Sequence, residues 1–273
     1  MKRGIDLSKH NWAGKRPVDF AKVREAGAEF VLLRAGYGSY PGQKDPYFDD
    51  GFRQATQAGL AVGAYWYSYA VTEAEALREA DQCLEALAGK CLPMGVWFDQ
   101  EYEPGILALT RAQRTAIVKA FCTKLRKAGW LCGLYCSRDW INHRLNARDL
   151  AGTELWVAAY TGQAGPGRTE LPWGIWQTAG SSGRWPGVDG PCDLDVACKD
   201  YPALVRHLGL CGCGKAEDPQ PPAPPAEQPG FVALPDGGGP DGPLARLTGL
   251  TGRDLAAAAQ MITAMGGRLG AGQ

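Results

Sequence analysis

Short apolar runs alternate with amphipathic stretches along the first 210 residues of the chain. The apolar runs have the length of buried strands and lie at residues 4–7, 30–35, 61–67, 95–99, 131–135, 155–159, 174–177 and 193–196. Between them, apolar residues recur with helical spacing at about 17–26, 45–58, 72–88 and 110–128, and again at 200–208. This order predicts an α/β fold, a (β/α) barrel whose strands are parallel at least in its first half. Few helical positions follow residue 155, so we expect an irregular, partly incomplete second half.

The composition changes sharply near residue 214. Six prolines crowd residues 219–229 beside almost no large apolar residue, which predicts an extended, semi-rigid linker. Farther on, Thr251 and Asp254 have the spacing of a capping box, and an apolar stripe follows it. We expect three parts: a domain at 1–214, a Pro/Gly-rich linker at 215–243 and a short helical segment at 244–273. A single helix is marginal alone, so its stripe is expected to self-associate or to dock loosely.

Charge and hydropathy exclude several classes of function. Lys and Arg total 29, as do Asp and Glu, so no net field attracts nucleic acid or an anionic membrane. No apolar run is long enough to span a bilayer. The N-terminus reaches Asp6 without the apolar stretch of a signal peptide. We therefore expect a protein that is made in the cytoplasm and does not insert into membranes.

Cysteine and histidine give little support to thiol or metal chemistry. The nine cysteines are odd in number and scattered, which favours reduced, structural thiols over a disulfide framework. The C-G-C run at 211–213 lacks the paired spacing of a zinc site, and His10, His143 and His207 have no ligand spacing. We expect no metal and no cofactor. A zinc amidase and a cysteine hydrolase are weak hypotheses, since no Cys lies at a convincing strand-to-helix junction.

The apolar run at 95–99 ends in two carboxylates, Asp99 and Glu101. Side chains two apart on a strand share a face, so the two acids are expected to point the same way. Crowded carboxyls cannot both ionise without cost. One keeps its proton while the other stays charged, which is what acid/base cleavage of a glycosidic bond requires. A lone pair of this kind more often solvates a strand end or caps a helix, so its meaning depends on the rest of the chain.

Further polar and aromatic residues stand at the predicted strand ends, where a parallel barrel forms its active site. Two are acids, Asp6 and Asp193, which would join the pair in one cleft. Unpaired acids are costly to bury, so four carboxyls at one end indicate a functional site. Each aromatic alone could equally be a core residue, but together they suit stacking on sugar rings. The residues that we expect to bind substrate are Arg34, Tyr37, Tyr65, Tyr67, Tyr135, Tyr160 and Gln177.

A series of short motifs runs through residues 3–208 in this order: Gly4-Ile5-Asp6-Leu7-Ser8, Leu33-Arg34-Ala35-Gly36-Tyr37-Gly38, Asp45-Pro46-Tyr47-Phe48, Ala58-Gly59-Leu60-Ala61-Val62-Gly63, Tyr65-Trp66-Tyr67-Ser68, Asp99-Gln100-Glu101, Trp156-Val157-Ala158, Trp176-Gln177 and Asp193-Leu194-Asp195. Each motif is weak alone, but their order and spacing together are specific. In these motifs the chain resembles glycoside hydrolase family 25, the muramidase-type lysozymes of bacteria and phage endolysins.

The resemblance implies a flattened, TIM-like α/β barrel that hydrolyses the β-1,4 bond between N-acetylmuramic acid and N-acetylglucosamine. Matched by position, Glu101 resembles the general acid and Asp99 its carboxylate partner, while Asp6 and Asp193 complete the acidic cleft. The chain departs from the family's pattern at three places: Asp195 replaces a usual Asn, Thr178-Ala179 replaces an aromatic, and Phe20 replaces a common Trp. These departures leave the fine substrate preference open, but they do not change the reaction that the resemblance implies.

The stereochemical course stays open at this level. Same-face residues two apart on a strand have Cβ atoms about 6.5–7 Å apart, between the carboxyl separations of retaining and inverting enzymes. The resemblance favours retention through the substrate's own N-acetyl group, with Asp99 orienting that group.

The main alternative function is a non-catalytic peptidoglycan-binding module on a glycosidase-like scaffold. Such a module would keep the aromatics and lose Asp99 or Glu101, whereas this chain has both. The absence of a signal peptide favours a phage or prophage endolysin that reaches the cell wall through a holin or on lysis. A host autolysin is the other origin that the sequence allows.

Overall fold

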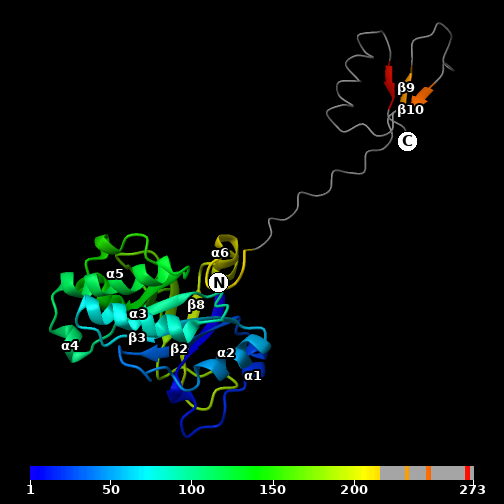
Figure 1. The fold of residues 1–273 in the computed structure, drawn as a ribbon. Coiled ribbons are helices and arrows are strands. Elements are labelled where there is room, and N and C mark those ends of the chain that lie inside the picture. The colour runs from blue at the N-terminus through cyan, green and yellow to red at the C-terminus, as the bar shows by residue number, and fades with distance from the viewer. Residues whose placement is uncertain (216–230, 234–243, 247–267, 271–273) are drawn as a thin grey trace. The chain divides into compact units, whose positions relative to one another are not determined.

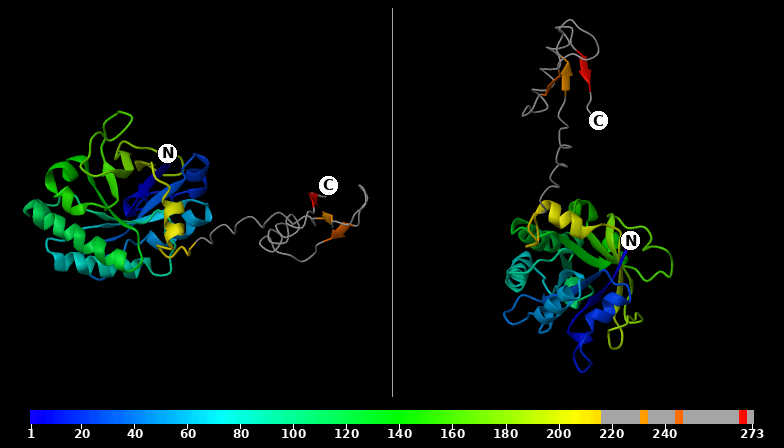
Figure 2. Two further views of the ribbon diagram at one scale, coloured as in Figure 1. Left: turned by 90° about the horizontal axis from the view of Figure 1, so that it is seen from above. Right: turned by 90° about the vertical axis from the view of Figure 1, so that its right-hand side faces the viewer.

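The computed structural model describes residues 1–215, 231–233, 244–246 and 268–270, and the chain divides into two compact units, Met1–Ala216 and Glu217–Gln273. The first unit is a closed barrel of eight strands with helices on its outside (Figure 1; Figure 2). The α/β barrel prediction is confirmed, and every strand of the barrel lies at a predicted apolar run: β1 (Lys2–Leu7), β2 (Phe30–Tyr37), β3 (Ala61–Tyr67), β4 (Val96–Asp99), β5 (Cys132–Ser137), β6 (Leu155–Ala158), β7 (Trp173–Ala179) and β8 (Asp193–Ala197).

One strand runs against the direction of the others. β1 to β7 are parallel, whereas β8 pairs antiparallel with both β7 and β1 and so closes the ring. The first and last strands meet along a register that opposes Gly4 to Asp195 and Asp6 to Asp193. The ring of strands is therefore complete, and what is missing from the second half is helix.

The helices gather around the first half of the barrel. They are α1 (Phe20–Glu25), α2 (Phe48–Gln57), α3 (Glu73–Leu87), α4 (Pro104–Leu107) and α5 (Arg111–Lys127), with α6 (Tyr201–Leu208) after the last strand. α3 and α5 pack against each other outside the strands (Figure 1), and each begins with a capping box on Thr72 or Thr110. Between β5 and β8 the only helical elements are two short turns, η2 (Trp140–Arg144) and η3 (Ala147–Leu150); the rest of this segment is β6, β7 and loops.

Aromatic side chains fill the barrel below the strand ends. Trp97 in β4 is fully buried, and its ring lies edge-on to Trp156 at 6.1 Å and to Tyr201 at 5.5 Å between centroids. Gly133 in β5 makes room for this ring, because a Cβ there would lie 2.4 Å from Trp97. Since the interior is packed in this way, the polar strand ends are left as the opening of the barrel.

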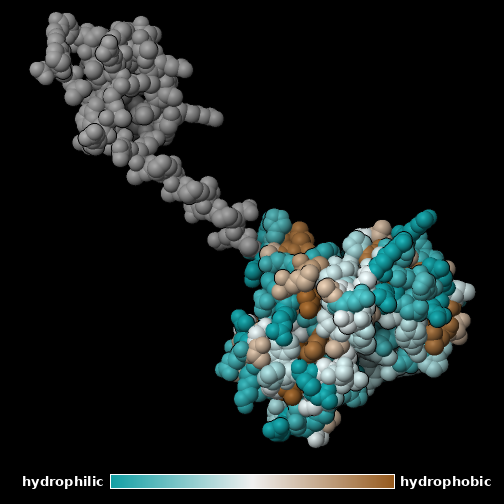
Figure 3. All heavy atoms as spheres, turned by 180° about the vertical axis from the view of Figure 1, so that it is seen from behind, coloured by the Kyte–Doolittle hydropathy of each residue, from teal (hydrophilic) through white to brown (hydrophobic). Residues whose placement is uncertain are grey.

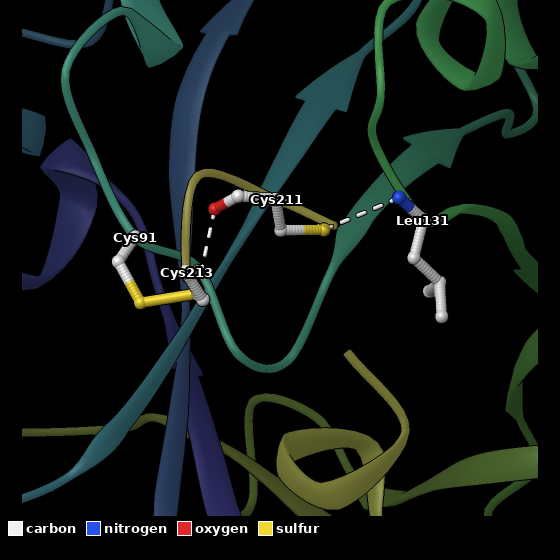
Figure 4. Close-up of a disulfide and its surroundings, with 4 residues drawn as sticks. All are labelled: Cys91, Leu131, Cys211 and Cys213. Carbon is white, nitrogen blue, oxygen red and sulfur yellow. Dashed lines mark hydrogen bonds between the residues drawn. A yellow bond between two sulfur atoms is a disulfide. The ribbon is translucent and has the colours of Figure 1, made fainter. Parts of the chain in front are cut away.

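A disulfide joins Cys91 to Cys213 (Figure 4). It ties the segment after α6 to the loop between α3 and β4, 122 residues away in sequence. The expectation that all nine cysteines are reduced is therefore wrong for this pair. The neighbouring Cys211 stays free and buried, and its sulfur accepts a hydrogen bond from the Leu131 amide at 3.2 Å. The other free cysteines fit the expected structural role, since all but Cys198 are buried.

In the second unit, the described residues form a small antiparallel sheet in the order β10–β9–β11: β9 (Phe231–Ala233), β10 (Leu244–Arg246) and β11 (Arg268–Gly270). β9 falls within the stretch predicted as linker. The helix predicted from Thr251 onward lies outside the described residues.

The face of the first unit shown in Figure 3 is mostly hydrophilic, with apolar side chains in small, separate groups. In the part of the chain that the structure describes, no helix combines the length and apolar character needed to cross a membrane.

Candidate active site

A pocket of about 310 Å³ lies at the barrel end where the strands β1 to β7 terminate. Asp99 is the last residue of β4, and Glu101 follows two residues later. Asp6 stands one residue before the end of β1. The residues lining the pocket are Asp6, His10, Arg34, Tyr65, Tyr67, Tyr69, Asp99, Glu101, Tyr135, Trp156, Gln177 and Asp193.

The reversed direction of β8 explains how Asp193 reaches this pocket. Asp193 is the first residue of its strand, which in a parallel barrel would place it at the far end. Because β8 is antiparallel to β1, its first residue pairs with Asp6 near the end of β1. The structure thus brings Asp6 and Asp193, from the two ends of the domain sequence, to the same pocket as Asp99 and Glu101.

Nine of the eleven residues predicted for the site line the pocket, and Tyr37 and Tyr160 do not. Tyr160 is mostly exposed, but its hydroxyl donates a 2.7 Å hydrogen bond to Oε1 of Gln177, a residue in the wall. The ring of Tyr37 lies 5.6 Å from the Arg34 guanidinium and edge-on to Tyr69, two residues of the wall. Both tyrosines therefore contact the wall without forming it.

Sequence reasoning missed three residues of the wall, His10, Tyr69 and Trp156. Tyr69 could have been found, because it continues the alternation of Tyr65 and Tyr67 beyond the end of β3. Trp156 lies within the fully buried strand β6, and the sequence does not show that its side chain points toward the pocket. His10 lies in η1 (Lys9–Asn11), a turn after β1 that no periodicity indicates.

Burial dominates the electrostatics of the carboxyl pair. It raises the pKa of Glu101 above its ordinary value, and the charge of Asp193 raises it further. This direction agrees with the acid role predicted for Glu101. Burial and the neighbouring Glu101 also raise the pKa of Asp99 well above the usual range of an Asp. The ionised Asp99 predicted from sequence is therefore not favoured by its surroundings, and the positive Arg34 is the group that lowers its pKa.

The other two acids are shifted in the same direction. Burial raises the pKa of Asp193 to about 6. For Asp6, burial and the nearby Asp195 and Asp193 raise the pKa well above its ordinary value. Crowding of acids in a partly dry pocket thus favours retention of protons, as acid catalysis needs.

Arg34 is held in the wall by an ion pair that sequence analysis did not predict. Its Nε donates to Oδ2 of Asp45 at 2.8 Å, and both side chains are nearly buried. The same Asp45 oxygen accepts the Lys9 amide at 3.0 Å, next to His10. The Nη2 atom of Arg34 is buried and has no hydrogen-bond partner among the described residues. The ion pair therefore fixes one side of the guanidinium and leaves the other side for a ligand.

The composition of the pocket bears on the weaker hypotheses. No cysteine is among its lining residues, and Cys213 of the C-G-C run is joined to Cys91. Across the described residues, no group of three or more His, Cys, Asp and Glu side chains is arranged to hold a metal ion. Within that part of the chain, the site offers carboxyl groups rather than thiols as its reactive side chains.

Residues 5–188, about two thirds of the chain, match the family described as glycosyl hydrolases family 25. The chain belongs to this family. Similar curated proteins include the lysozyme of Lactococcus phage mv1, which is 24% identical over 67% of this chain and 94% of that protein. The autolytic lysozyme of Clostridium acetobutylicum is 29% identical over 71% of this chain and 55% of its own length. The chain is accordingly a glycoside hydrolase.

Solved structures of similar proteins share the barrel. The CTP1L endolysin is 26% identical with a TM-score of 0.64, over 75% of this chain and 69% of that one. The autolysin LytC of Streptococcus pneumoniae is 26% identical with a TM-score of 0.62, over 71% of this chain and 46% of that one. The bacterial lysozyme of Streptomyces coelicolor, at 21% identity and a TM-score of 0.63, matches 78% of this chain and 98% of that one and supports the fold alone.

Proposed function

We propose that this family 25 glycoside hydrolase is a muramidase. It cleaves the β-1,4 bond between N-acetylmuramic acid and N-acetylglucosamine in bacterial peptidoglycan. The observation that carries the proposal is the Asp99–Glu101 pair, which lies in a pocket with buried polar atoms that have no hydrogen-bond partner among the described residues. Oδ1 of Asp99 and Nη2 of Arg34 are both buried without a hydrogen-bond partner in the described part of the chain. The hydroxyl and acetamido groups of an aminosugar would satisfy such atoms.

Glu101 is proposed as the general acid. Its raised pKa keeps a proton available at mildly acidic pH, and that proton passes to the oxygen of the leaving sugar. Asp99 orients the acetamido group of the reacting sugar, and in its ionised form, which the positive Arg34 favours against the effect of burial, it stabilises the positive charge that develops there. Asp6 and Asp193 act through orientation and through the local field.

The aromatic wall is proposed to hold the sugar rings. Tyr65, Tyr67 and Tyr135 line the pocket with the predicted Gln177, and the ring of Tyr69 continues the same side. Tyr67 is fixed by a 2.6 Å hydrogen bond from its hydroxyl to Glu103. Fixed aromatic faces beside hydrogen-bonding groups are suited to saccharides, which have both apolar and hydroxylated sides.

The biological setting is proposed from the relatives, which include a phage lysozyme, an endolysin and an autolytic lysozyme. We infer an endolysin that acts on the cell wall after its release from the cell that made it. Self-association through the C-terminal segment is a separate proposal, and it rests on the apolar stripe in that segment's sequence.

The test is to digest purified peptidoglycan, reduce the new sugar ends with borohydride and identify them by mass spectrometry. A muramidase produces reduced N-acetylmuramic acid, whereas a glucosaminidase would produce reduced N-acetylglucosamine. Glu101→Gln keeps the size of the side chain but has no transferable proton, so its turnover should fall by roughly 10²–10⁴-fold. Asp99→Asn should lose activity to a comparable extent.

Glu29→Gln is the matched control. It makes the same chemical change at an exposed position before β2, at the other end of the barrel. Thermal melting should show that all three variants are folded. A folded Glu101→Gln protein with near wild-type turnover would contradict the assignment and favour a glycan-binding module.

A further inference from the structure

Behind the pocket lies a carboxyl group that the proposed mechanism does not use, that of Asp195 in β8. Its side chain is 2% exposed. Oδ1 accepts a hydrogen bond from Nε1 of Trp156 at 2.8 Å, while Oδ2 is buried and receives no hydrogen bond from any described donor. A buried acceptor without a donor costs free energy, so the group that faces Oδ2 of Asp195 decides whether this cost is met.

That group is the carboxyl of Asp6, which lies within hydrogen-bond reach of Asp195 from the neighbouring strand β1. Two ionised carboxylates are acceptors only and cannot bond to each other. With one proton between them, the same two groups form a strong hydrogen bond.

Among the described residues, the remaining contacts of Asp6 supply no other donor to Oδ2 of Asp195. The hydroxyls of Tyr135 and Tyr160 both donate to Oε1 of Gln177, at 2.9 and 2.7 Å. The amide nitrogen of Gln177 therefore faces Asp6 and donates to its Oδ2 at 2.8 Å. Asp6 and Asp195 thus receive one outside donor each, from Gln177 and from Trp156. Among the described residues, the Asp6 carboxyl is the group that faces the unpartnered Oδ2 of Asp195.

We propose that Asp6 and Asp195 share one proton and act as a single unit that holds the Asp6 carboxyl in position in the active site. Asp195 is in this view a positioning residue, which works through Asp6 and does not touch the substrate. The shared proton also limits the charge of the pair to −1, beside a pocket that already contains Asp99, Glu101 and Asp193. The inference goes beyond the proposed function, because it concerns the protonation of the protein whatever glycan is cleaved.

The surroundings of the pair favour retention of this proton. Burial raises the pKa of Asp195 to about 8, and it also raises the pKa of Asp6. The titratable groups that face Asp195 are Asp6 from β1, Tyr160 beyond β6, Asp193 at the start of β8 and Cys192 just before it. The acids among them oppose a second negative charge, and the groups named include no base that would stabilise it.

Stability against pH gives a test that does not depend on activity. A folded-state pKa raised above the unfolded value means that the native protein holds a proton that the unfolded chain releases. Its contribution to stability is present below the ordinary pKa of Asp and is lost as the pH rises to about 8. Asp195→Asn supplies an N–H donor to Asp6 that does not titrate. Its melting temperature relative to wild type should therefore rise between pH 4 and 8, whereas that of the exposed Asp149→Asn should not.

Enzyme activity provides a second test of the proposal. Asp195→Leu removes both the shared proton and the acceptor of Trp156, and kcat should fall by about tenfold or more. Asp195→Asn should recover most of that loss at acidic pH with little change in KM. The proposal is overturned if the Asn and wild-type proteins show parallel melting curves against pH, or if the Asn and Leu variants are equally impaired while folded. The melting result holds or fails independently of whether peptidoglycan is the substrate.

Discussion

At the scale of single residues, the pocket contains four acids, and the pKa of one acid depends on the charge of its neighbours. Burial raises the pKa of each of the four pocket acids, and neighbouring acids raise the pKa values of Asp6, Asp99 and Glu101 further. Only Arg34 acts in the opposite direction on Asp99. The rate should therefore follow a bell-shaped dependence on pH whose limbs belong to the coupled group rather than to any one residue.

Asp193→Asn tests this coupling. The negative charge of Asp193 raises the pKa of Glu101, so its removal should lower that pKa. Glu101 would then lose its catalytic proton at a lower pH, and the alkaline limb of kcat/KM should move toward acid. The measurement is the pH profile on solubilised peptidoglycan, with Asp189→Asn, a surface aspartate paired with Arg16, as control. An alkaline limb that stays in place would show that Asp193 does not act on the general acid.

At the scale of elements, α3 supports the pocket from outside the barrel. Glu79 on α3 is fully buried, and its Oε1 accepts the Tyr69 amide at 2.9 Å. The preceding residue, Ser68, donates its amide to the Asp99 carbonyl at 2.9 Å. One carboxyl on a helix thus anchors the loop after β3, which carries Tyr69 in the wall and is bonded to the strand that carries Asp99.

Glu79→Leu should loosen this loop, because it leaves the Tyr69 amide buried without an acceptor, at a cost of about 1–3 kcal/mol of stability. KM should rise as Tyr69 loses its fixed place in the wall. Glu79→Gln keeps an acceptor at the same position and should recover most of both losses. Denaturant unfolding of the two variants measures the change in stability, and steady-state kinetics measures the change in KM. Equal effects of Leu and Gln would mean that the charge of Glu79, and not its hydrogen bond, is what matters.

At the scale of the whole molecule, residues 1–215 contain everything that the proposed reaction uses. The barrel closes through the pairing of β1 with β8, and Cys213 lies before the end of this unit. Truncation after Lys215 should therefore leave hydrolysis of soluble peptidoglycan fragments unchanged. If the C-terminal segment self-associates, sedimentation should show a smaller particle after truncation than the lost mass explains. Loss of activity on soluble fragments would make the segment part of the active fold.

The disulfide is a second feature of the whole molecule. It closes a loop of 122 residues, and in a chain-entropy model such a link contributes about 2–5 kcal/mol by restricting the unfolded chain. Cys213→Ala should lower the unfolding free energy by an amount in this range, while Cys198→Ala, at an exposed free cysteine, should change it little. Thiol counting on the denatured wild-type protein, with and without reductant, checks the bond directly. Nine reactive thiols without reductant would contradict it.

Local sequence determined the elements and most of the candidate site. Apolar runs of strand length place all eight barrel strands, because burial on both faces of a strand leaves a continuous local signature. The same locality holds for Asp99 and Glu101, which are two residues apart at the end of β4 and both line the pocket. Tyr69 could also have been predicted to line the pocket, because it alternates with Tyr65 and Tyr67.

The tertiary structure alone decided which distant residues meet. The direction of β8 depends on how the last strand fits between β7 and β1, and this direction brings Asp193 to the pocket and Asp195 to Asp6. The same is true of Cys91 with Cys213 and of Glu79 with the Tyr69 amide. Such contacts join residues that share no periodicity, and they form only when the whole barrel closes. Their energies come from burial and desolvation, which depend on everything packed around them rather than on the neighbouring sequence.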